Sequence, residues 1–349
     1  MFQPQYSITN RLLANIKRIN ALVSELNDKR FPNIVLLELE RNAREVSTFA
    51  STSIEGNPLP LTEVKKILKS ASTYVRDSEK EVLNYNQALQ DLNKQLEEGE
   101  IALSLHLILK IQKQVVEGLL PKFETGYLRE KPVVVNDPRT RQPVYLPPDV
   151  KEVKPLMEDL VAFINKNREK IDSLILAGIF HKQMVIIHPF MDGNGRTTRL
   201  ATKILLAAMG LNTFNLFSFE NYYNQNVTKY FHTVGESGNY YDIQNLPAGR
   251  QVDFTNWLEY FTEGIIDELL RVQKLLPEIS LSPKSELQSY HLKILGFIQK
   301  KGFISVSDYA KFSDRAKATR ALDFQKLIKL GLIERHGKGR ATFYVLKEK

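Results

Sequence analysis

The chain has 349 residues, of which 43% are hydrophobic and 25% are charged, and this ordinary globular composition excludes wholesale disorder. Its length exceeds what one hydrophobic core usually serves, so we expect two or three domains. The absence of cysteine excludes disulfides, thiolate metal sites and thiol nucleophiles. The first residues lack a basic stretch followed by an apolar run, and no apolar run is long enough to cross a bilayer, so we expect a cytoplasmic protein without membrane contact.

The net charge of +8 is concentrated at the C-terminal end of the chain. Residues 284–349 hold 15 Lys and Arg against 6 Asp and Glu, a net charge of +9, so the rest of the chain is close to neutral. A local basic excess is typical of a nucleic-acid contact, but a solvated basic surface has the same composition.

Hydrophobic residues at helical spacing predict a mainly α protein. The second helix should end at Glu55-Gly56-Asn57-Pro58, because Gly tolerates a left-handed backbone and Pro cannot continue a helix. The expected helices cover residues 9–27, 34–53, 61–70, 77–98, 101–118, 150–169, 172–187, 194–209 and 253–275.

The segment from Lys131 to Pro148 has the pattern of a β-hairpin. Two apolar stretches, Val133-Val134-Val135 and Val144-Tyr145-Leu146, flank a turn of Asn136-Asp137-Pro138-Arg139-Thr140. By itself this pattern is equally compatible with a surface hairpin that has no role in function.

The C-terminal segment resembles a winged helix-turn-helix. Residues 276–283 have the composition of a linker, and residues 246–250 that of an inserted loop. Helices are expected over 290–300, 306–312 and 315–330, with Ala321, Phe324 and Ile328 facing the core. Wing strands are expected over 332–334 and 342–345, around a basic turn that contains Lys338 and Arg340. Such domains bind proteins as well as DNA, so either partner is open.

The residues with the clearest chemistry are His-Pro-Phe-Met-Asp-Gly-Asn-Gly-Arg-Thr-Thr-Arg, at positions 188–199. A turn of Gly193-Asn194-Gly195 can direct successive amides at an anion, and the helix that we expect to start near Arg196 adds its N-terminal dipole. Arg196 and Arg199 are three residues apart, so both point to one side of that helix, where each can bind phosphate oxygens. Asp192 can hold a Mg²⁺ that bridges phosphates, and His188 is the natural general base because its pKa is ordinarily near neutral.

This stretch matches every specified position of the signature of the Fic family, His-Pro-Phe-x-Asp/Glu-Gly-Asn-Gly-Arg-x-x-Arg. The resemblance covers roughly residues 35–270 and implies a Fic helical core with a β-hairpin flap. Members of the family transfer AMP from ATP to Tyr, Thr or Ser hydroxyls of target proteins.

Carried over to this chain, the resemblance implies a role for each residue of the motif. His188 would deprotonate the incoming hydroxyl, and Asp192 would bind Mg²⁺, or alternatively Mn²⁺, on the α- and β-phosphates of ATP. The loop of Gly193, Asn194 and Gly195 with Arg196 would cradle those phosphates, and Arg199 would grip the γ-phosphate.

Two further contacts are implied for the nucleotide and the target. Tyr230 is the best match for the tyrosine that the family uses on the adenine side, and Asn226 is a match for its polar contact. The 131–148 hairpin follows Gly126-Tyr127-Leu128-Arg129, at the place of the family's flap, where an extended target segment pairs with the edge of a strand.

Residues 51–56, Ser-Thr-Ser-Ile-Glu-Gly, match the family's inhibitory motif, Ser/Thr-x-x-x-Glu-Gly/Asn. Ser51 and Glu55 are four residues apart and share one helix face. Glu55 would pair with Arg199 and occupy the place of the γ-phosphate contact. The plainer interpretation is an exposed glutamate before a helix stop.

We therefore expect three regions in the chain. Residues 1–100 form an N-terminal helical region with an inhibitory helix near 40–56, residues 101–276 form the Fic catalytic core, and residues 284–349 form the winged-helix-like domain. Three activities are open, of which the first is AMP transfer. The second is hydrolytic removal of AMP with Glu55 positioning a water, alone or together with transfer. The third is regulation by a DNA-binding protein whose core only senses nucleotide. Because His188 is intact, the sequence favours an enzyme over a sensor. The sequence leaves open the target, the preferred nucleotide and whether the protein forms a homodimer.

Overall fold

The computed structural model describes residues 2–28, 33–69, 76–99, 101–137, 140–207, 217–244, 252–275, 287–330, 332–337, 339 and 342–347. The chain divides into two compact units: the larger unit joins Met1–Lys29 to Asn42–Leu275, and the C-terminal unit joins Arg30–Arg41 to Leu276–Lys349. The predicted linker at 276–283 and the inserted loop at 246–250 lie outside the described residues. The predicted boundary near residue 100 stays a prediction.

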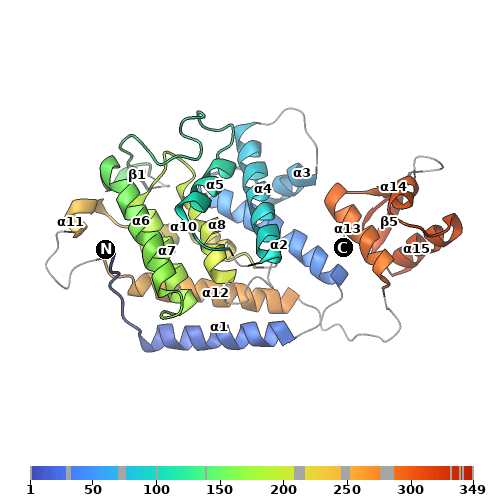
Figure 1. The fold of residues 1–349 in the computed structure, drawn as a ribbon, viewed down its shortest axis with the longest axis horizontal. Helices are drawn as coiled ribbons and strands as arrows, with labels where there is room; N and C mark the ends of the chain where they lie inside the picture. Colours follow the sequence, from blue (N-terminus) through green and yellow to red (C-terminus); the bar gives the residue numbers. More distant parts are fainter. Residues whose placement is uncertain are drawn as a thin grey trace. The chain divides into compact units, whose positions relative to one another are not determined.

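The fold is mainly α, as predicted, and Figure 1 shows its helices in order along the chain. Most predicted helices agree with the structure to within a few residues at each end. The helices that end by residue 275 are α1 (Asn10–Asp28), α2 (Asn33–Ile54), α3 (Leu61–Lys69), α4 (Asp77–Glu98), α5 (Leu105–Val115), α6 (Val150–Asn167), α7 (Ser173–Ile187), α8 (Asn194–Ala207), α9 (Glu220–Gln225), α10 (Val227–Val234), α11 (Tyr240–Gln244) and α12 (Thr255–Leu275).

Helix α7 lies at the centre of the larger unit. It is apolar on nearly every side and packs against α6, α8, α10 and α12, so its residues from Leu174 to Met184 are buried. The close approach of α12 requires a glycine, since a Cβ at Gly178 would overlap the side chain of Leu258. At the same place the indole of Trp257 donates to the Gly178 carbonyl at 2.7 Å. Helix α1 lies along α12 (Figure 1).

The predicted hairpin is present and is part of a small sheet with the order β1-β2-β3. Strand β1 (Val135–Asn136) pairs antiparallel with β2 (Pro143–Leu146). The sequence did not predict β3 (Gly238–Asn239), which pairs parallel with β2 on its other side. Strand β2 is therefore central, and the segment after α10 is joined to the hairpin.

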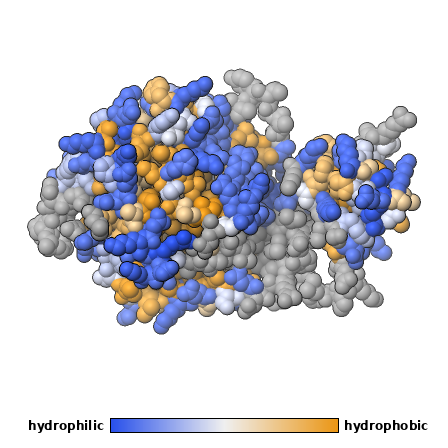
Figure 2. Space-filling model, viewed as in Figure 1, coloured by the Kyte–Doolittle hydropathy of each residue, from blue (hydrophilic) through white to orange (hydrophobic). Residues whose placement is uncertain are grey.

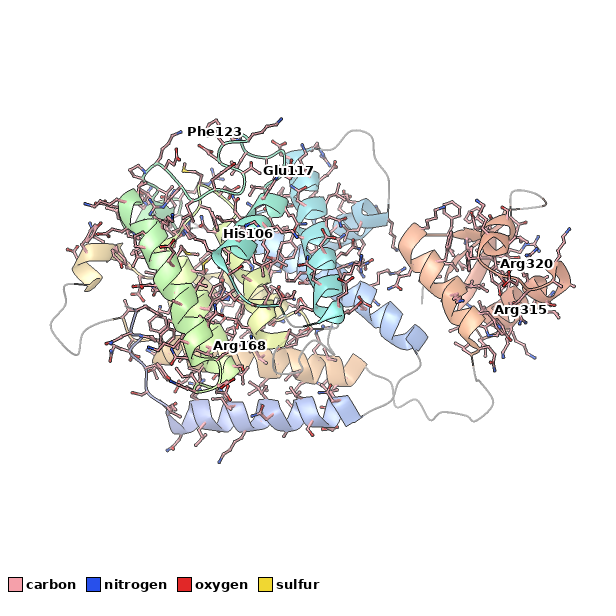
Figure 3. All side chains as sticks on the ribbon, viewed as in Figure 1. His106, Glu117, Phe123, Arg168, Arg315 and Arg320 are labelled. Atoms are coloured by element: carbon pink, nitrogen blue, oxygen red, sulfur yellow. The ribbon has the colours of Figure 1, made fainter. Side chains whose placement is uncertain are left out.

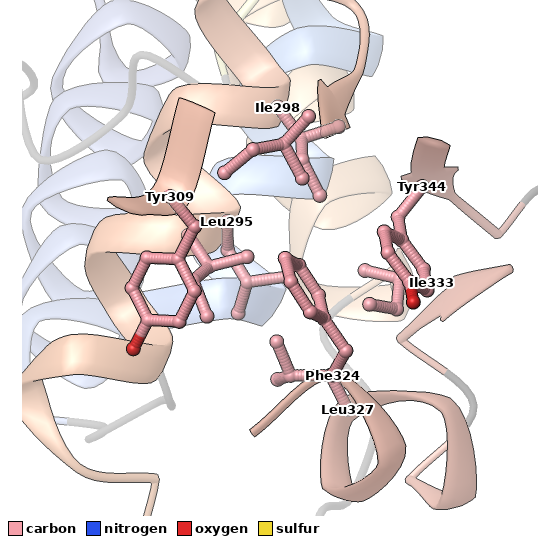
Figure 4. Packing of buried hydrophobic residues seen from close by; sticks show 9 residues of the cluster. Leu295, Ile298, Tyr309, Phe324, Leu327, Ile333 and Tyr344 are labelled. Carbon is pink, nitrogen blue, oxygen red and sulfur yellow. The ribbon is translucent and has the colours of Figure 1, made fainter. Parts of the chain in front are cut away.

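The C-terminal unit contains α13 (Ser289–Lys301), α14 (Val306–Lys311), α15 (Lys317–Lys329) and an antiparallel sheet of β4 (Ile304–Ser305), β6 (Phe343–Leu346) and β5 (Ile333–His336), in that spatial order. The aromatic rings of Phe324 and Tyr344 stack at 4.1 Å in the middle of its core (Figure 4). The element order matches the prediction apart from β4, while the assignment as a winged helix-turn-helix stays a prediction.

The predicted core face of α15 was partly wrong. Phe324 is buried, but Ala321 and Ile328 are exposed, and Leu327 is buried in their place. The helix turns its inward face by one residue because Phe324 and Leu327, three apart, both pack against the sheet and α13.

None of the helices in the described ranges is both long and apolar enough to cross a membrane. On the face shown in Figure 2, hydrophobic side chains of the larger unit gather between α6 and α4, where Figure 1 shows α5 and α8. Hydrophilic side chains cover most of the outer helices on that face. The helices around the apolar centre are those that carry the predicted site.

The stacked pair in the C-terminal unit gives a test of its core. Phe324→Ala should lower the free energy of unfolding of this unit by about 3–5 kcal/mol, because it leaves a cavity under Tyr344. Ile328→Ala, an exposed position on the same helix, should change that free energy by about 0.5 kcal/mol at most. Hydrogen exchange of the α13 and β6 amides measures both, and equal effects of the two variants would contradict the described core.

Candidate active site

His188 ends α7 in a left-handed conformation, with φ of 49° and ψ of 61°. A residue other than glycine rarely adopts this conformation, and it persists only where the surroundings hold it. The backbone N–H of His188 donates to the carbonyl of Met184 at 3.0 Å, which closes the helix. The chain then leaves the helix axis abruptly, and the imidazole lines the cavity described below.

Arg129 holds this strained junction in place. Its Nε donates to the His188 carbonyl at 2.9 Å, and its backbone N–H donates to the Pro189 carbonyl at 2.9 Å. Its guanidinium also donates to the carbonyls of Lys131 and Pro148, at the two ends of the hairpin. One buried arginine therefore ties the position of His188 to the position of the hairpin.

The glycine-containing turn leads directly into α8. Gly193 has φ of 80°, and a Cβ there would overlap Val116, so the position requires glycine. The side chain of Asn194 accepts from the Phe190 N–H and donates to the Phe190 carbonyl, both at 2.9 Å. Helix α8 begins at Asn194, the first residue of the helix expected over 194–209, so its N-terminal amides belong to the turn itself. The side chain of Asn194 is occupied inside the loop, which leaves its backbone amide as the group for an anion.

Arg196 is buried between two carboxylates. Its Nη2 donates to both oxygens of Asp192 at 2.9 Å, and its Nη1 pairs with Glu81 of α4 at 2.7 Å. Glu81 in turn accepts from the side-chain amide of Asn57 at 2.6 Å, just beyond the end of α2. The loop, α4 and the end of α2 are thus joined through one guanidinium.

Arg199 is fully buried and meets the N-terminal helix α2. Its Nε donates to the Ser51 hydroxyl, and its Nη2 donates to the Ser51 carbonyl and to Glu55 Oε1, all at 2.8 Å. Its Nη1 is buried without a hydrogen-bond partner among the described residues. A Cβ at Gly195 would overlap the Glu55 carboxylate, so this glycine makes room for the pair.

A cavity of about 120 Å³ brings His188, Asn194, Gly195 and Arg199 together with Glu55. It is lined by Glu55, Val135, Asn136, Asp137, Val144, Tyr145, Val185, His188, Asn194, Gly195, Arg199, Thr228, Tyr230, Phe231, His232, Val234, Gly235, Glu236 and Ser237. The predicted phosphate and metal contacts Asp192, Gly193 and Arg196 are not among the described residues that line it. One end is charged and contains the start of α8, while valine and aromatic side chains form much of the rest.

Of the two predicted nucleotide contacts beyond the motif, the structure brings only Tyr230 to this cavity. Its hydroxyl lies 2.8 Å from Nε2 of the buried His181, and its ring stacks on Tyr223 at 5.0 Å. Asn226 caps α10, where its side chain accepts from the Lys229 N–H at 3.0 Å, and it is not among the described residues that line the cavity.

Burial of the imidazole sets the protonation state of His188. It lowers the pKa of His188 to about 4, because a cation there would lose its hydration, and the Val185 carbonyl and the Glu55 carboxylate oppose this effect only in part. The imidazole is therefore neutral at pH 7 and able to accept a proton.

Asp192 suits a cation that brings its own remaining ligands. Its carboxylate is half exposed beside the start of α8, and its backbone carbonyl accepts from Gln112 at 3.3 Å. The described residues contain no group of three His, Asp or Glu side chains that could hold a metal ion. One carboxylate fits Mg²⁺, which keeps several waters and usually shares its ligands with substrate phosphates.

Sequence reasoning missed Glu81 and Lys182. Both are charged side chains inside predicted helices, and nothing in helical periodicity separates a buried ion pair from a solvated one. Lys182 could have been found by its position, because it lies in the otherwise apolar run that precedes His188.

Comparison with known proteins gives the context of this geometry. Residues 102–206 match the model of the Fic/DOC family. The curated protein adenylyltransferase Fic of Aedes aegypti is 28% identical over 217 residues, which are 57% of this chain and 42% of the relative. The Drosophila melanogaster protein of the same name is 26% identical over the same shares. The chain thus spans less than half the length of these relatives.

Solved structures are similar to the fold. A Fic family protein from Desulfovibrio desulfuricans has a TM-score of 0.62 at 21% identity and covers 100% of this chain and 99% of its own. A Fic domain-containing signalling protein from Bacteroides thetaiotaomicron has a TM-score of 0.59 at 18% identity, over 76% of this chain and 96% of its own. Fic-1 from C. elegans has a TM-score of 0.55 at 24% identity, over 75% and 73%. The predicted Fic-type fold is confirmed.

The lowered pKa of His188 can be measured directly. In protein labelled at histidine, the His188 resonances should stay unchanged between pH 7.5 and 5.5, because burial disfavours the cation over that whole range. An ordinary histidine would be about 90% protonated at pH 5.5. The His188→Ala spectrum assigns the signal, and a midpoint near pH 6.5 would contradict a buried neutral base.

Proposed function

We propose that the Fic domain of this chain transfers AMP from ATP to a hydroxyl group of a target protein. The observation that carries the proposal is one cavity in which a neutral His188 lies with the N-terminal amides of α8 and the buried Arg199. The relatives named protein adenylyltransferase support the same activity.

In the proposed reaction, the hydroxyl of the target gives its proton to His188 as its oxygen attacks the α-phosphorus of ATP. The bond from that phosphorus to the bridging oxygen breaks, and pyrophosphate leaves in line. Phosphoryl transfer of this kind depends on positioning and charge neutralisation more than on covalent help. The strained His188 junction, held by Arg129, supplies the positioning.

The charge neutralisation falls to the loop and its arginines. The amides of Asn194 and Gly195 at the start of α8 would meet the phosphates, while the Gly193 amide donates to Asp192 Oδ1 at 2.6 Å. The unpaired Nη1 of the buried Arg199 is the group expected for the γ-phosphate, since a buried donor without an acceptor is costly. Arg196 would join the phosphate cradle by sharing its guanidinium with Asp192. Asp192 would hold Mg²⁺, or alternatively Mn²⁺, which supplies further neutralisation of the phosphates.

The hairpin is the proposed docking edge for the target. Strand β2 is paired on both sides, so β1 and β3 are the two edge strands among the described strands of this sheet, and β1 is the edge that belongs to the hairpin. Its neighbours Val134 and Val144 are exposed. An extended segment of the target can add to this edge through main-chain hydrogen bonds, which places its hydroxyl near the cavity.

Glu55 is the proposed brake. It pairs with Arg199 at 2.8 Å and lies against Gly195. Its carboxylate therefore fills the space that the γ-phosphate would need and binds the guanidinium that the γ-phosphate would contact. Ser51 holds the same guanidinium from the previous turn of α2. ATP that enters while this pair is formed would be misplaced for attack.

The C-terminal unit is proposed to bind a protein partner rather than DNA. Arg315 and Arg320 lie in the C-terminal unit (Figure 3), within the helix expected over 315–330, where a DNA-binding domain would need free basic side chains. The guanidinium of Arg315 pairs with Asp323 at 2.8 Å and lies 3.6 Å from the centre of the Tyr290 ring. Arg315 is therefore held by its own unit. The basic residues Lys338 and Arg340 of the expected wing lie outside the described residues.

Glu55→Gly should raise the labelling of target and of the protein itself by α-labelled ATP, because Arg199 regains its free guanidinium. Arg199→Ala should stay inactive with or without Glu55→Gly, since the γ-phosphate partner is then missing. Incubation with a host lysate measures both. Glu117→Gly is the matched control, an exposed glutamate in the turn after α5 (Figure 3). Equal labelling by Glu55→Gly and the unchanged chain would remove the brake from the proposal.

His188→Ala in the Glu55→Gly background should lower AMP transfer by about 10²–10⁴-fold, the usual effect of losing a general base. Binding of ATP should persist, because the amides and Arg199 remain. Filter retention of labelled ATP and target labelling separate the two effects. Transfer at the unreduced rate would show that another group takes the proton.

A further inference from the structure

One wall of the cavity is formed by the segment from Val234 to Ser237, between α10 and β3. It is fixed at one end by the pairing of Gly238 with Tyr145 in β2. At its other end, a lysine of α7 donates hydrogen bonds to its backbone carbonyls. These four residues, called the wall segment, line the cavity beyond its charged end.

The lysine is Lys182, six residues before His188. Its ammonium is 3% exposed and donates to the carbonyls of Thr233, Val234 and Gly235 at 3.1–3.4 Å. It also pairs with Glu236 at 2.7 Å. Burying an ammonium costs free energy unless it is fully paired, so its position in an apolar helix depends on the contacts that it makes. Here it caps the last carbonyls of α10 and fixes the Glu236 carboxylate.

The charges of the cavity define where each part of a nucleotide can lie. The amides of α8 and Arg199 take phosphates, so the base must lie elsewhere, among apolar walls such as Val144, Val185 and Phe231. Of the carboxylates that line the cavity, Glu55 pairs with Arg199, and Asp137 accepts the Thr140 N–H inside the hairpin turn. Glu236 is the one that belongs to the wall segment, where it pairs with Lys182, and a quarter of its side chain is exposed.

We propose that Glu236, held by Lys182, determines the base specificity of the site by accepting a hydrogen bond from the exocyclic amino group of adenine. The inference rests on the proposed function, because it requires a nucleotide whose phosphates meet Arg199. A fixed carboxylate favours an amino donor and repels the oxygen that guanine carries at the same place. A site built around such an acceptor rejects analogues that lack the donor far more strongly than an apolar pocket can.

The pair with Lys182 is what makes the carboxylate selective. A glutamate without this pair could rotate its carboxylate toward solvent and would not discriminate between bases. The Lys182 ammonium, itself bound to three carbonyls, fixes the position of the Glu236 carboxylate. Lys182 is thus a positioning residue, and Glu236 is the residue that meets the base.

The test is equilibrium binding by titration calorimetry at fixed Mg²⁺, with the full chain and three probes: ATP, GTP, and purine riboside triphosphate, which lacks the amino group. The unchanged chain should bind ATP about 10–100-fold more tightly than purine riboside triphosphate, the usual effect of a hydrogen bond to a charged group. GTP should be weaker than ATP by at least that factor.

Glu236→Ala should bring the ratio of the dissociation constants for purine riboside triphosphate and for ATP close to one. Glu236→Gln is a second variant that keeps the size of the side chain, and it should lower the ratio less. Lys182→Met should lower the ratio although Glu236 is still present, and Lys182→Arg should restore part of it. Glu117→Ala, remote from the cavity, should leave the ratio unchanged.

An unchanged ratio in Glu236→Ala and Glu236→Gln, or tighter binding of GTP than of ATP by the unchanged chain, overturns the inference. If ATP binds selectively but no target is labelled in the Glu55→Gly variant, the proposed transfer fails while the base specificity stands. If none of the three probes binds, both fail.

Discussion

The structure depends on the way in which the buried guanidinium of Arg199 is satisfied. A guanidinium with no exposure needs acceptors, and these are Ser51 of α2 and Glu55, which directly follows α2, 148 and 144 residues away in sequence. Breaking a buried ion pair by removing one partner typically costs about 3–5 kcal/mol. The N-terminal helix is therefore held at the site by the same charge that a nucleotide would use, and a triphosphate is the natural replacement for the carboxylate. In the proposed function, inhibition and the packing of the N-terminal helix depend on this one ion pair.

Arg196, one turn earlier on α8, is a second buried guanidinium that is paired with carboxylates. Asp192 and Glu81 neutralise it, and Asn57 connects Glu81 to the turn that follows Glu55. The two arginines are thus paired with two carboxylates of the N-terminal region, one directly after α2 and one from α4. The start of α8, with Asp192, the candidate metal ligand, is linked by these contacts to the end of α2 and to α4.

The sequence predicted most of the helices and the groups of the 188–199 motif, because both depend on local spacing. It could not predict β3 or the wall segment, since a two-residue strand has no periodicity and its partners in β2 lie 93 positions earlier in the chain. It placed Tyr230 correctly at the cavity but not Asn226, whose side chain serves as a helix cap, a role that any Asn before a helix can take. It assigned Ile328 to the core because hydrophobicity alone cannot give the phase of a helix that has apolar residues on two faces.

Helix α7 shows why these features cannot be separated from one another. His181 contacts Tyr230, Lys182 contacts the wall segment, and His188 caps the same helix at the start of the 188–199 motif. Three polar side chains of one rigid element therefore set the distances between the parts of the cavity. Its burial on nearly all sides is what makes it rigid, because every shift would disturb packing against α6, α8 and α12. In the proposed function, a nucleotide would bind along this helix, and its base, sugar and phosphates would meet groups whose spacing α7 fixes. The packing of α7 would thus set the geometry for in-line attack before any substrate enters.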